Sequence, residues 1–216
     1  MGFSFDPMIK EYRKLYQENG LSPSSLGCPK GRQELRFNNA MKYLNKSKSL
    51  IDFGCGFGDF YQFLSFNGYD IDYYGVDIVS DFINEAKKKH KKAYFKLIKP
   101  LEEINLRVES VCCLGVFNYL YSENEKEHFD LIKILIKQLW NCIDKNLVID
   151  FQSSFIEFKQ PSAYHQELGK LTEFLNKEIS KRFIIDYSYM PYEFMISIYK
   201  DLDLKNSSTF LNDLNL

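Results

Sequence analysis

Glycines at positions 54, 56 and 58 follow a short apolar run at residues 50–53. Such a run is typical of a strand that is covered on both faces, and a helix is expected over residues 61–66. Glycines in a strand–helix turn let the backbone approach a ligand closely. A second apolar strand ends about twenty residues later in Asp77, where a carboxylate can accept hydrogen bonds from ribose hydroxyls. These two elements predict a site for an adenosine-bearing ligand.

Asp59 narrows the choice of ligand. A dinucleotide-binding turn would carry its third glycine at position 59, where this sequence has an acid. Asp59 opens the next helix, whose positive N-terminus would otherwise receive a pyrophosphate, and its carboxylate repels phosphate. A ligand with a cationic centre and no phosphate, such as S-adenosylmethionine (SAM), suits this turn better. A dinucleotide site and a glycine turn without any ligand are the alternatives.

The segment Asp52-Phe53-Gly54-Cys55-Gly56-Phe57-Gly58 resembles the first motif of the class I SAM-dependent methyltransferases, and the resemblance extends over residues 32–200. It implies SAM as cofactor, S-adenosylhomocysteine (SAH) as product, and an α/β fold. The implied Rossmann-like sheet has seven strands in the order 3-2-1-4-5-7-6, with strand 7 antiparallel and an N-terminal helical cap. The residues implied for cofactor binding are Gln33, Arg36, Asp52, Gly54, Cys55, Gly56, Asp77, Ile78, Leu97, Leu114, Gly115 and Phe117.

The hydrophobic pattern predicts the elements of this fold. Helices are expected over residues 7–19, 32–44, 80–90 and 164–181, with strands over 73–77, 93–95, 109–114 and 146–151. A capping box formed by Ser122 and Glu125 is expected to begin a further long helix. Strands at 182–187 and 193–199 are joined by a short link, which requires an antiparallel hairpin. We expect a helical cap over residues 1–45, a SAM-binding domain over 46–200 and a frayed tail over 201–216.

Arg36 lies in the segment Gln33-Glu34-Leu35-Arg36-Phe37, just before the first strand. In the bacterial methyltransferases that the chain resembles, a comparable segment caps the cofactor, and its arginine faces the methionine carboxylate. A guanidinium matches a carboxylate with two parallel hydrogen bonds, which agrees with this role. The alternative is an arginine on a solvated helix face.

The acceptor side is less clearly marked. Related enzymes often carry an acid after the third strand, near the adenine amino group; here the sequence is Lys96-Leu97-Ile98-Lys99, so we expect an apolar or backbone contact. The turn at residues 115–119 lacks the prolines common in enzymes that methylate base amino groups. His165 is the candidate base, because it follows the fifth strand and imidazole titrates near neutrality. Tyr119 is a second catalytic candidate, Tyr119, Tyr164 and His165 are candidate substrate contacts, and positioning without a base is the alternative.

Composition limits the class of partner. The chain has 216 residues, with 28 basic and 29 acidic side chains, and this balance argues against a polyanion as the main partner. The lysine run at residues 87–92 suits a helix C-terminus, so nucleic acid is not expected. Five cysteines without a C-x-x-C pair suggest buried thiols in a reducing compartment. With no apolar leader, no run of membrane length and no metal-ligand spacing around the three histidines, we expect a cytoplasmic protein without membrane insertion or metal.

The sequence therefore predicts a SAM-dependent methyltransferase. The segments 33–37, 115–118 and 189–194 are most similar to small bacterial enzymes of surface-polysaccharide biosynthesis. That resemblance implies O-methylation of a small polar metabolite, such as a sugar, nucleotide sugar or phosphate-type group, for a capsule or lipopolysaccharide. Methylation of another small metabolite or of RNA, and a non-catalytic SAM-binding module, are the alternatives. The acceptor and the oligomeric state are left open by the sequence.

Overall fold

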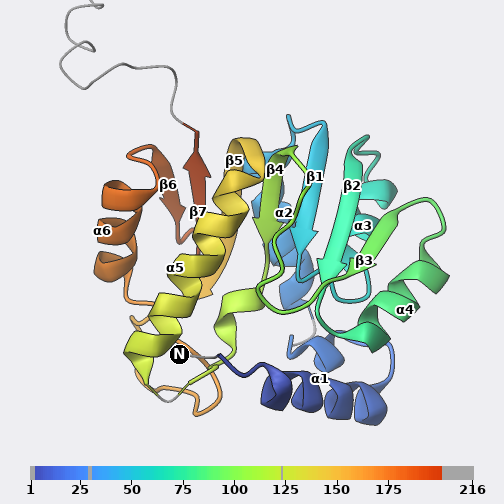
Figure 1. Cartoon of the computed structure of the whole chain (residues 1–216), viewed down its shortest axis with the longest axis horizontal. Helices are drawn as coiled ribbons and strands as arrows, with labels where there is room; N and C mark the ends of the chain where they lie inside the picture. The colour runs from blue at the N-terminus through green and yellow to red at the C-terminus, as the bar shows by residue number, and fades with distance from the viewer. Residues whose placement is uncertain (1–2, 29–30, 123, 201–216) are drawn as a thin grey trace, which may run out of the picture.

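A computed structural model of the chain describes residues 3–28, 31–122 and 124–200; the tail expected at 201–216 lies outside them (Figure 1). The helices are α1 (Asp6–Asn19), η1 (Pro23–Leu26), α2 (Arg32–Leu44), α3 (Asp59–Phe66), α4 (Ser80–Lys89), η2 (Val116–Asn118), α5 (Glu125–Asn141) and α6 (Leu168–Glu178). The strands are β1 (Ser49–Phe53), β2 (Asp72–Asp77), β3 (Tyr94–Leu97), β4 (Val108–Cys113), β5 (Ile143–Gln152), β6 (Phe183–Asp186) and β7 (Glu193–Tyr199).

All seven of these strands form one sheet in the order β3-β2-β1-β4-β5-β7-β6. The pairs from β3 through β5 are parallel, and β7 runs antiparallel to both β5 and β6. The predicted fold class is therefore confirmed, including the hairpin that places the last strand inside the sheet. Helices on both faces cover the sheet (Figure 1), as the apolar sequences of its parallel strands require.

Alternating side chains along the strands separate two hydrophobic cores. Leu50 points to the face covered by α2 and α3, whereas Ile51 points to the face covered by α5. Figure 1 shows α5 in front of the sheet and α2 and α3 behind it. The same alternation recurs in β5, where Val148 joins the first of these cores and Ile149 the second. Both faces of the sheet are thus buried. The end of the sheet that remains open is the one formed by the carboxyl ends of its parallel strands.

Helix α1 lies across that end of the sheet, below the carboxyl ends of β1, β2 and β4 (Figure 1). A proline in its first turn suits the start of a helix, and Gly20 ends it with a φ of 63°. Arg13 attaches the helix to α4, through Asp81 at 2.9 Å and Ser80 at 2.8 Å. Helix α1 therefore brings its inner side chains over the ends of the strands.

Two local predictions are wrong. The segment before α6 is extended rather than helical up to Leu168, because its backbone pairs with two neighbours: the Leu120 amide donates to Ser162 and the Gln166 amide to Gln152. Helix α5 is capped by Asn124 instead of Ser122, since the Asn124 side chain accepts hydrogen bonds from the amides of Lys126 and Glu127. The first difference changes the setting of His165, which lies on the extended segment.

Candidate functional site

Asp77 connects the ends of the first two strands. At the carboxyl end of β2 its buried Oδ2 accepts a hydrogen bond from the Gly56 amide at 2.9 Å, and its Oδ1 accepts one from the Val79 amide at 2.8 Å. Burial raises the pKa of Asp77, and these backbone amides oppose the rise. Each carboxylate oxygen can accept a further hydrogen bond, so Asp77 keeps the capacity to bind a pair of hydroxyls.

The glycine turn after β1 is packed too closely for side chains. Gly54 has a φ of 80°, in the left-handed region, and a Cβ there would collide with the side chain of Val116. Gly56, with a φ of 54°, would bring a Cβ to 3.0 Å from the Leu26 side chain. The turn is thus held between η1 and the segment after β4, with backbone rather than side chain against the cavity.

Asp59 begins α3 and contacts side chains of two other helices. Gln33 on α2 donates a hydrogen bond to Oδ2 of Asp59 at 3.3 Å, and Nζ of Lys89 on α4 lies 2.8 Å from Oδ1. The positive N-terminus of α3 is therefore already matched by a carboxylate with its own partners. A phosphate group would have to displace that carboxylate.

Asp52 lies on β1, beneath the turn, and is 3% exposed. Its carboxylate accepts hydrogen bonds from neutral donors, namely the hydroxyl of Tyr73 and the thiol of Cys112. Burial raises the pKa of Asp52 to about 6, and these two donors only partly oppose it. This acid is thus buried, and no cation from residues 3–28, 31–122 or 124–200 pairs with it.

A single cavity at the carboxyl edge of the sheet gathers most of the predicted cofactor residues. Leu97 and Phe117 are not among its lining: Leu97 is 45% exposed on β3, and Phe117 is buried against the ring of Phe151. The predicted residues that line the cavity are Gln33, Arg36, Asp52, Gly54, Cys55, Gly56, Asp77, Ile78, Leu114 and Gly115. They come from α2, from the ends of β1 and β2, and from the turn after β4.

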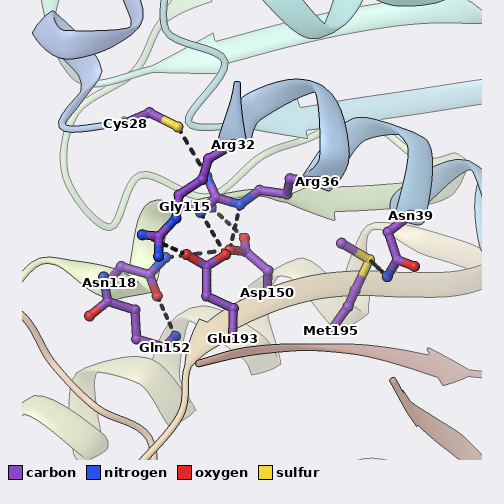
Figure 2. Close-up of polar contacts among 10 residues, drawn as sticks. All are labelled: Cys28, Arg32, Arg36, Asn39, Gly115, Asn118, Asp150, Gln152, Glu193 and Met195. Atoms are coloured by element: carbon purple, nitrogen blue, oxygen red, sulfur yellow. Dashed lines mark hydrogen bonds and ion pairs between the residues drawn. The ribbon is translucent and has the colours of Figure 1, made fainter. Parts of the chain in front are cut away.

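Arg36 lies across β1 from Asp77 and is buried between two acids (Figure 2). Its Nε is 2.9 Å from Oδ2 of Asp150 near the end of β5, and its Nη2 is 3.0 Å from Oε2 of Glu193 at the start of β7. Arg32, one helical turn earlier, approaches Oε1 of Glu193 to 3.4 Å. Only 8% of Arg36 is exposed, so the alternative of an arginine on a solvated helix face is wrong.

The third nitrogen of the Arg36 guanidinium is turned toward the cavity. Nη1 lies 3.9 Å from Sγ of Cys28, and a Cβ on Gly115 would lie 3.2 Å from it; both Cys28 and Gly115 line the cavity. Two of the three nitrogens are therefore committed to protein carboxylates. The paired, two-nitrogen contact expected for a ligand carboxylate is replaced by the Nη1 edge, which pairs with no protein carboxylate in the described part of the chain and donates to the thiol of Cys28.

Asp150 also fixes the turn that follows β4. Its Oδ1 accepts a hydrogen bond from the Gly115 amide at 2.5 Å, and its Oδ2 one from the Asn118 side chain at 3.4 Å. The amide of Gln152 donates in turn to Oδ1 of Asn118 at 2.8 Å. Figure 2 shows this chain of contacts running from α2 through β5 to the turn. The turn and Arg36 are thus held by the same carboxylate.

Charges in this cluster are balanced, since two guanidiniums face two carboxylates. Burial alone would lower the pKa of Arg36, but Asp150 and Glu193 raise it well above its ordinary value, so the side chain stays protonated. Tyr189 is buried beside the same groups, where desolvation and then the two acids raise the pKa of its hydroxyl. Burial raises the pKa of the Asp150 carboxyl, and the Arg36 guanidinium opposes that rise.

The segment after β3 supplies an acid that the sequence analysis missed. Ile98, Pro100, Leu101 and Glu102 line the cavity. Glu102 is held by the Lys99 amide at 2.8 Å and by Nζ of Lys96 at 2.9 Å. The acid lies five residues beyond Leu97, after Leu101 turns the chain with a φ of 59°. We missed this acid because we expected it directly after the strand.

The predicted acceptor residues are neighbours, but none of them lines the cavity. Tyr119 pairs with Ala163 in an isolated bridge, and the ring of Tyr164 stacks on that of the fully buried His128 with centroids 3.8 Å apart. His165 follows directly, and burial, then Lys159, lower the pKa of its imidazole. The wall of the cavity next to α1 is instead lined by Phe5, Met8, Tyr12 and Tyr121.

Tyr12 is the polar member of the wall contributed by α1. Its hydroxyl forms no hydrogen bond within the described part of the chain, and Asp77, Tyr119 and Arg36 all act on its pKa. Burial, and then Asp77 and Tyr119, raise that pKa, so the hydroxyl keeps its proton. No pattern in the sequence around Tyr12 indicates this position, because only the packing of α1 brings the residue to the cavity.

Comparison with known proteins identifies the fold. No family model matches the sequence, and no curated protein matches it. Magnesium protoporphyrin IX methyltransferase from Synechocystis PCC 6803, solved with SAH, superposes with a TM-score of 0.64 at 16% identity over 90% of this chain and 95% of that one. The DhpI–SAH complex gives a TM-score of 0.67 at 10% identity, over 89% of this chain and 95% of that one. This chain has the methyltransferase fold.

A larger enzyme shares the fold as a part of its length. Human N-acetylserotonin methyltransferase, in complex with SAM, matches with a TM-score of 0.64 at 9% identity, over 89% of this chain and 59% of that one. Among the described residues, no group of three or more His, Cys, Asp or Glu side chains could hold a metal ion. No described helix has both the length and the apolar character needed to cross a membrane.

Proposed function

We propose that this protein is a SAM-dependent methyltransferase acting on a small-molecule acceptor. The observation that carries the proposal is one cavity in which the left-handed glycine turn, the carboxylate of Asp77 and the Nη1 edge of Arg36 meet. These groups match a ligand with ribose hydroxyls and a carboxylate, and Asp59 disfavours one with phosphates. The shared fold of the SAM- and SAH-bound structures supports the same ligand.

The donor set fits the cofactor in detail. Asp77 would accept hydrogen bonds from the ribose hydroxyls, and Nη1 of Arg36 would donate to the methionine carboxylate. Ile78 and Ile98 would pack against the adenine, with Glu102 as the acid on its edge. A Cβ at Gly54 would collide with Val116, and one at Gly115 would lie 3.2 Å from Nη1 of Arg36, so the packing requires glycine at both positions. Bound SAM would supply a methyl group on a positively charged sulfur.

The protein's own contribution is mainly orientation and exclusion of water. Alignment of reacting groups can supply about 7–11 kcal/mol of the barrier reduction at best. Phe5, Met8 and Tyr121 provide apolar walls, and the hydroxyl of Tyr12 is the group that we assign to hold the acceptor. His165 and Tyr119 lie outside the cavity lining, so we propose positioning as the main source of acceleration and give His165 no step.

The acceptor class is proposed from two directions. The resemblance of the segments 33–37, 115–118 and 189–194 favours O-methylation of a sugar, nucleotide sugar or phosphate-type metabolite destined for a surface glycan. The aromatic wall under α1 favours an acceptor with an apolar or aromatic face. Both classes can present a hydroxyl to Tyr12, and both therefore belong in one screen.

The test has two stages. Isothermal titration calorimetry with SAM and SAH measures cofactor binding, and a coupled assay for SAH release then screens activated sugars, phosphorylated metabolites and hydroxylated aromatic compounds. We expect binding of both ligands, and SAH release that depends on one acceptor class. Absence of SAM and SAH binding by the folded protein would overturn the proposal. Binding without release for any acceptor, RNA included, would favour the non-catalytic SAM-binding module.

A further inference from the structure

We propose that Asp150 and Glu193 are positioning residues for the cofactor's amino-acid end, a proposal that rests on the function proposed above. Neither acid lines the cavity, and both are buried: Asp150 is 0% exposed and Glu193 is 1% exposed. Both acids pair with Arg36, and Asp150 also holds the cavity-lining turn after β4 through the amide of Gly115. Their role is to turn one edge of the guanidinium, the Nη1 edge, toward the ligand carboxylate.

The geometry leaves Arg36 little freedom. Asp150 pairs with Nε at 2.9 Å and Glu193 with Nη2 at 3.0 Å, so the two acids hold adjacent nitrogens of one planar group from two different strands. The Nη2 contact is a hydrogen bond, whereas the Nε contact is an ion pair without hydrogen-bond geometry, and together they restrict rotation of the planar group about its long axis. Gly115 completes the arrangement, because a Cβ there would lie 3.2 Å from Nη1.

Glu193 is itself kept in place by Arg32. Oε1 of Glu193 lies 3.4 Å from Nη1 of Arg32, whose side chain is 33% exposed, while its other oxygen pairs with Arg36. Arg32 and Arg36 are four residues apart on α2 and so project from the same face of the helix. The cluster thus has no net charge before a ligand carboxylate arrives, and Arg36 is already oriented when the ligand binds.

Positioning and simple charge predict opposite results. A ligand carboxylate near Arg36 is repelled by Asp150 and Glu193, so removing either acid would strengthen ligand binding if charge alone mattered. If the acids orient Arg36, removing one lets the guanidinium turn away from the ligand, and binding weakens. The sign of the change therefore decides between the two accounts.

The experiment compares two ligands that differ only at the amino-acid end. SAH carries the carboxylate, whereas 5′-methylthioadenosine carries the same adenosine and sulfur without it. Calorimetry should show SAH binding about tenfold weaker in Asp150→Asn and in Glu193→Gln, the loss for about one charge-assisted hydrogen bond. Binding of 5′-methylthioadenosine should stay within about twofold of the parent, well below that loss. Both substitutions keep the shape of the side chain.

Asp186→Asn is the matched control. Asp186, on β6 of the same hairpin, pairs with Lys42 of the same helix α2 at 3.1 Å and accepts a hydrogen bond from Tyr43 at 2.8 Å. It does not line the cavity. Loosening the attachment of α2 to the hairpin therefore affects this variant too, but the orientation of Arg36 is untouched. Its SAH to 5′-methylthioadenosine affinity ratio should equal that of the parent.

Each outcome separates this proposal from the function on which it rests. If the parent protein binds neither ligand, the proposed function fails. If the parent binds SAH and the two variants keep the parental affinity ratio, or bind SAH more tightly, the positioning proposal alone is overturned. Should Asp150→Asn not fold, Glu193→Gln and the stability of the SAH complex in Glu193→Asp provide the same comparison, since the shorter acid retains the charge but not the reach.

Discussion

The two anchors of the cavity are built in different ways. Asp77 is fixed by backbone amides of Gly56 and Val79, which lie in the turns after β1 and β2. Arg36 is fixed by the side chains of Asp150 and Glu193, which lie far away in the sequence. A backbone-held anchor depends on local chain geometry, whereas a side-chain-held anchor depends on the whole sheet being assembled. The difference shows which anchor of the site is set by the conformation of nearby turns and which one requires the tertiary structure.

Removing Arg36 should have the largest effect. Arg36→Ala leaves the buried Asp150 without its cation and Glu193 with only the more distant Arg32, so the free energy of unfolding should fall by about 3–5 kcal/mol. Urea denaturation of the parent and the variant measures this difference. Lys42→Ala, on the same helix, removes an ion pair whose lysine is half exposed, and should cost at most about 1 kcal/mol. Equal losses in the two variants would contradict the distinction between a buried and an exposed pair.

The pH dependence of stability tests the buried acid that has no cation. In the folded protein the pKa of Asp52 is about 6, above the ordinary value of 3.8, so the folded state holds the proton more tightly than the unfolded chain. The contribution is favourable at low pH and is lost as the pH rises from about 4 to about 6, by on the order of 2–3 kcal/mol. Denaturation of Asp52→Asn across this range should lack that decline. An identical slope in parent and variant would assign the titration to another group.

Asp77 should affect both ligands alike. Asp77→Ala removes the proposed ribose contact, which SAH and 5′-methylthioadenosine share, so both affinities should fall by about 1–3 kcal/mol. Calorimetry with the two ligands provides the measurement, and retained thermal stability of the SAH-free variant is the control. A loss confined to SAH would place the ribose elsewhere and remove the contrast with Asp150 and Glu193.

The smallest effect is expected at the acceptor wall. Tyr12→Phe removes one hydroxyl without changing the ring. The transition-state stabilisation measured by kcat/KM, for the acceptor found by the screen, should therefore fall by about 0.5–1.5 kcal/mol. SAH affinity should not change. Tyr16→Phe, one helical turn further along α1, is the matched control and should leave kcat/KM as in the parent. A larger loss in the Tyr16 variant would point to the stability of α1 rather than to a contact with the acceptor.

The fold could be predicted because its signals are local. The apolar strand, the glycine turn at 54–58 and the acid at the end of β2 all act within their own stretch of chain. The short link predicted the antiparallel hairpin, and the resemblance to the methyltransferases implied the strand order. Arg36 was found through its segment, but its partners were not, since nothing in the sequence near Asp150 or Glu193 shows that β5 and β7 pair beside α2. Glu102 was missed because a left-handed turn at Leu101 intervenes.

The acceptor side could not be predicted for the same reason. His165 and Tyr164 were chosen by their position after the fifth strand, but that segment pairs through its backbone with residues 118–120 and 152–154 and does not reach the cavity lining. Tyr12 comes from a helix more than thirty positions before β1, and only the packing of α1 across the strand ends brings it to the site.

The pairing of Arg36 with Glu193 has a consequence for the order in which the protein is made. These residues are 157 positions apart, and Glu193 begins the last strand to leave the ribosome, which must still insert between β5 and β6. During synthesis the glycine turn and Asp77 are therefore present well before Glu193, which Arg36 requires as a partner.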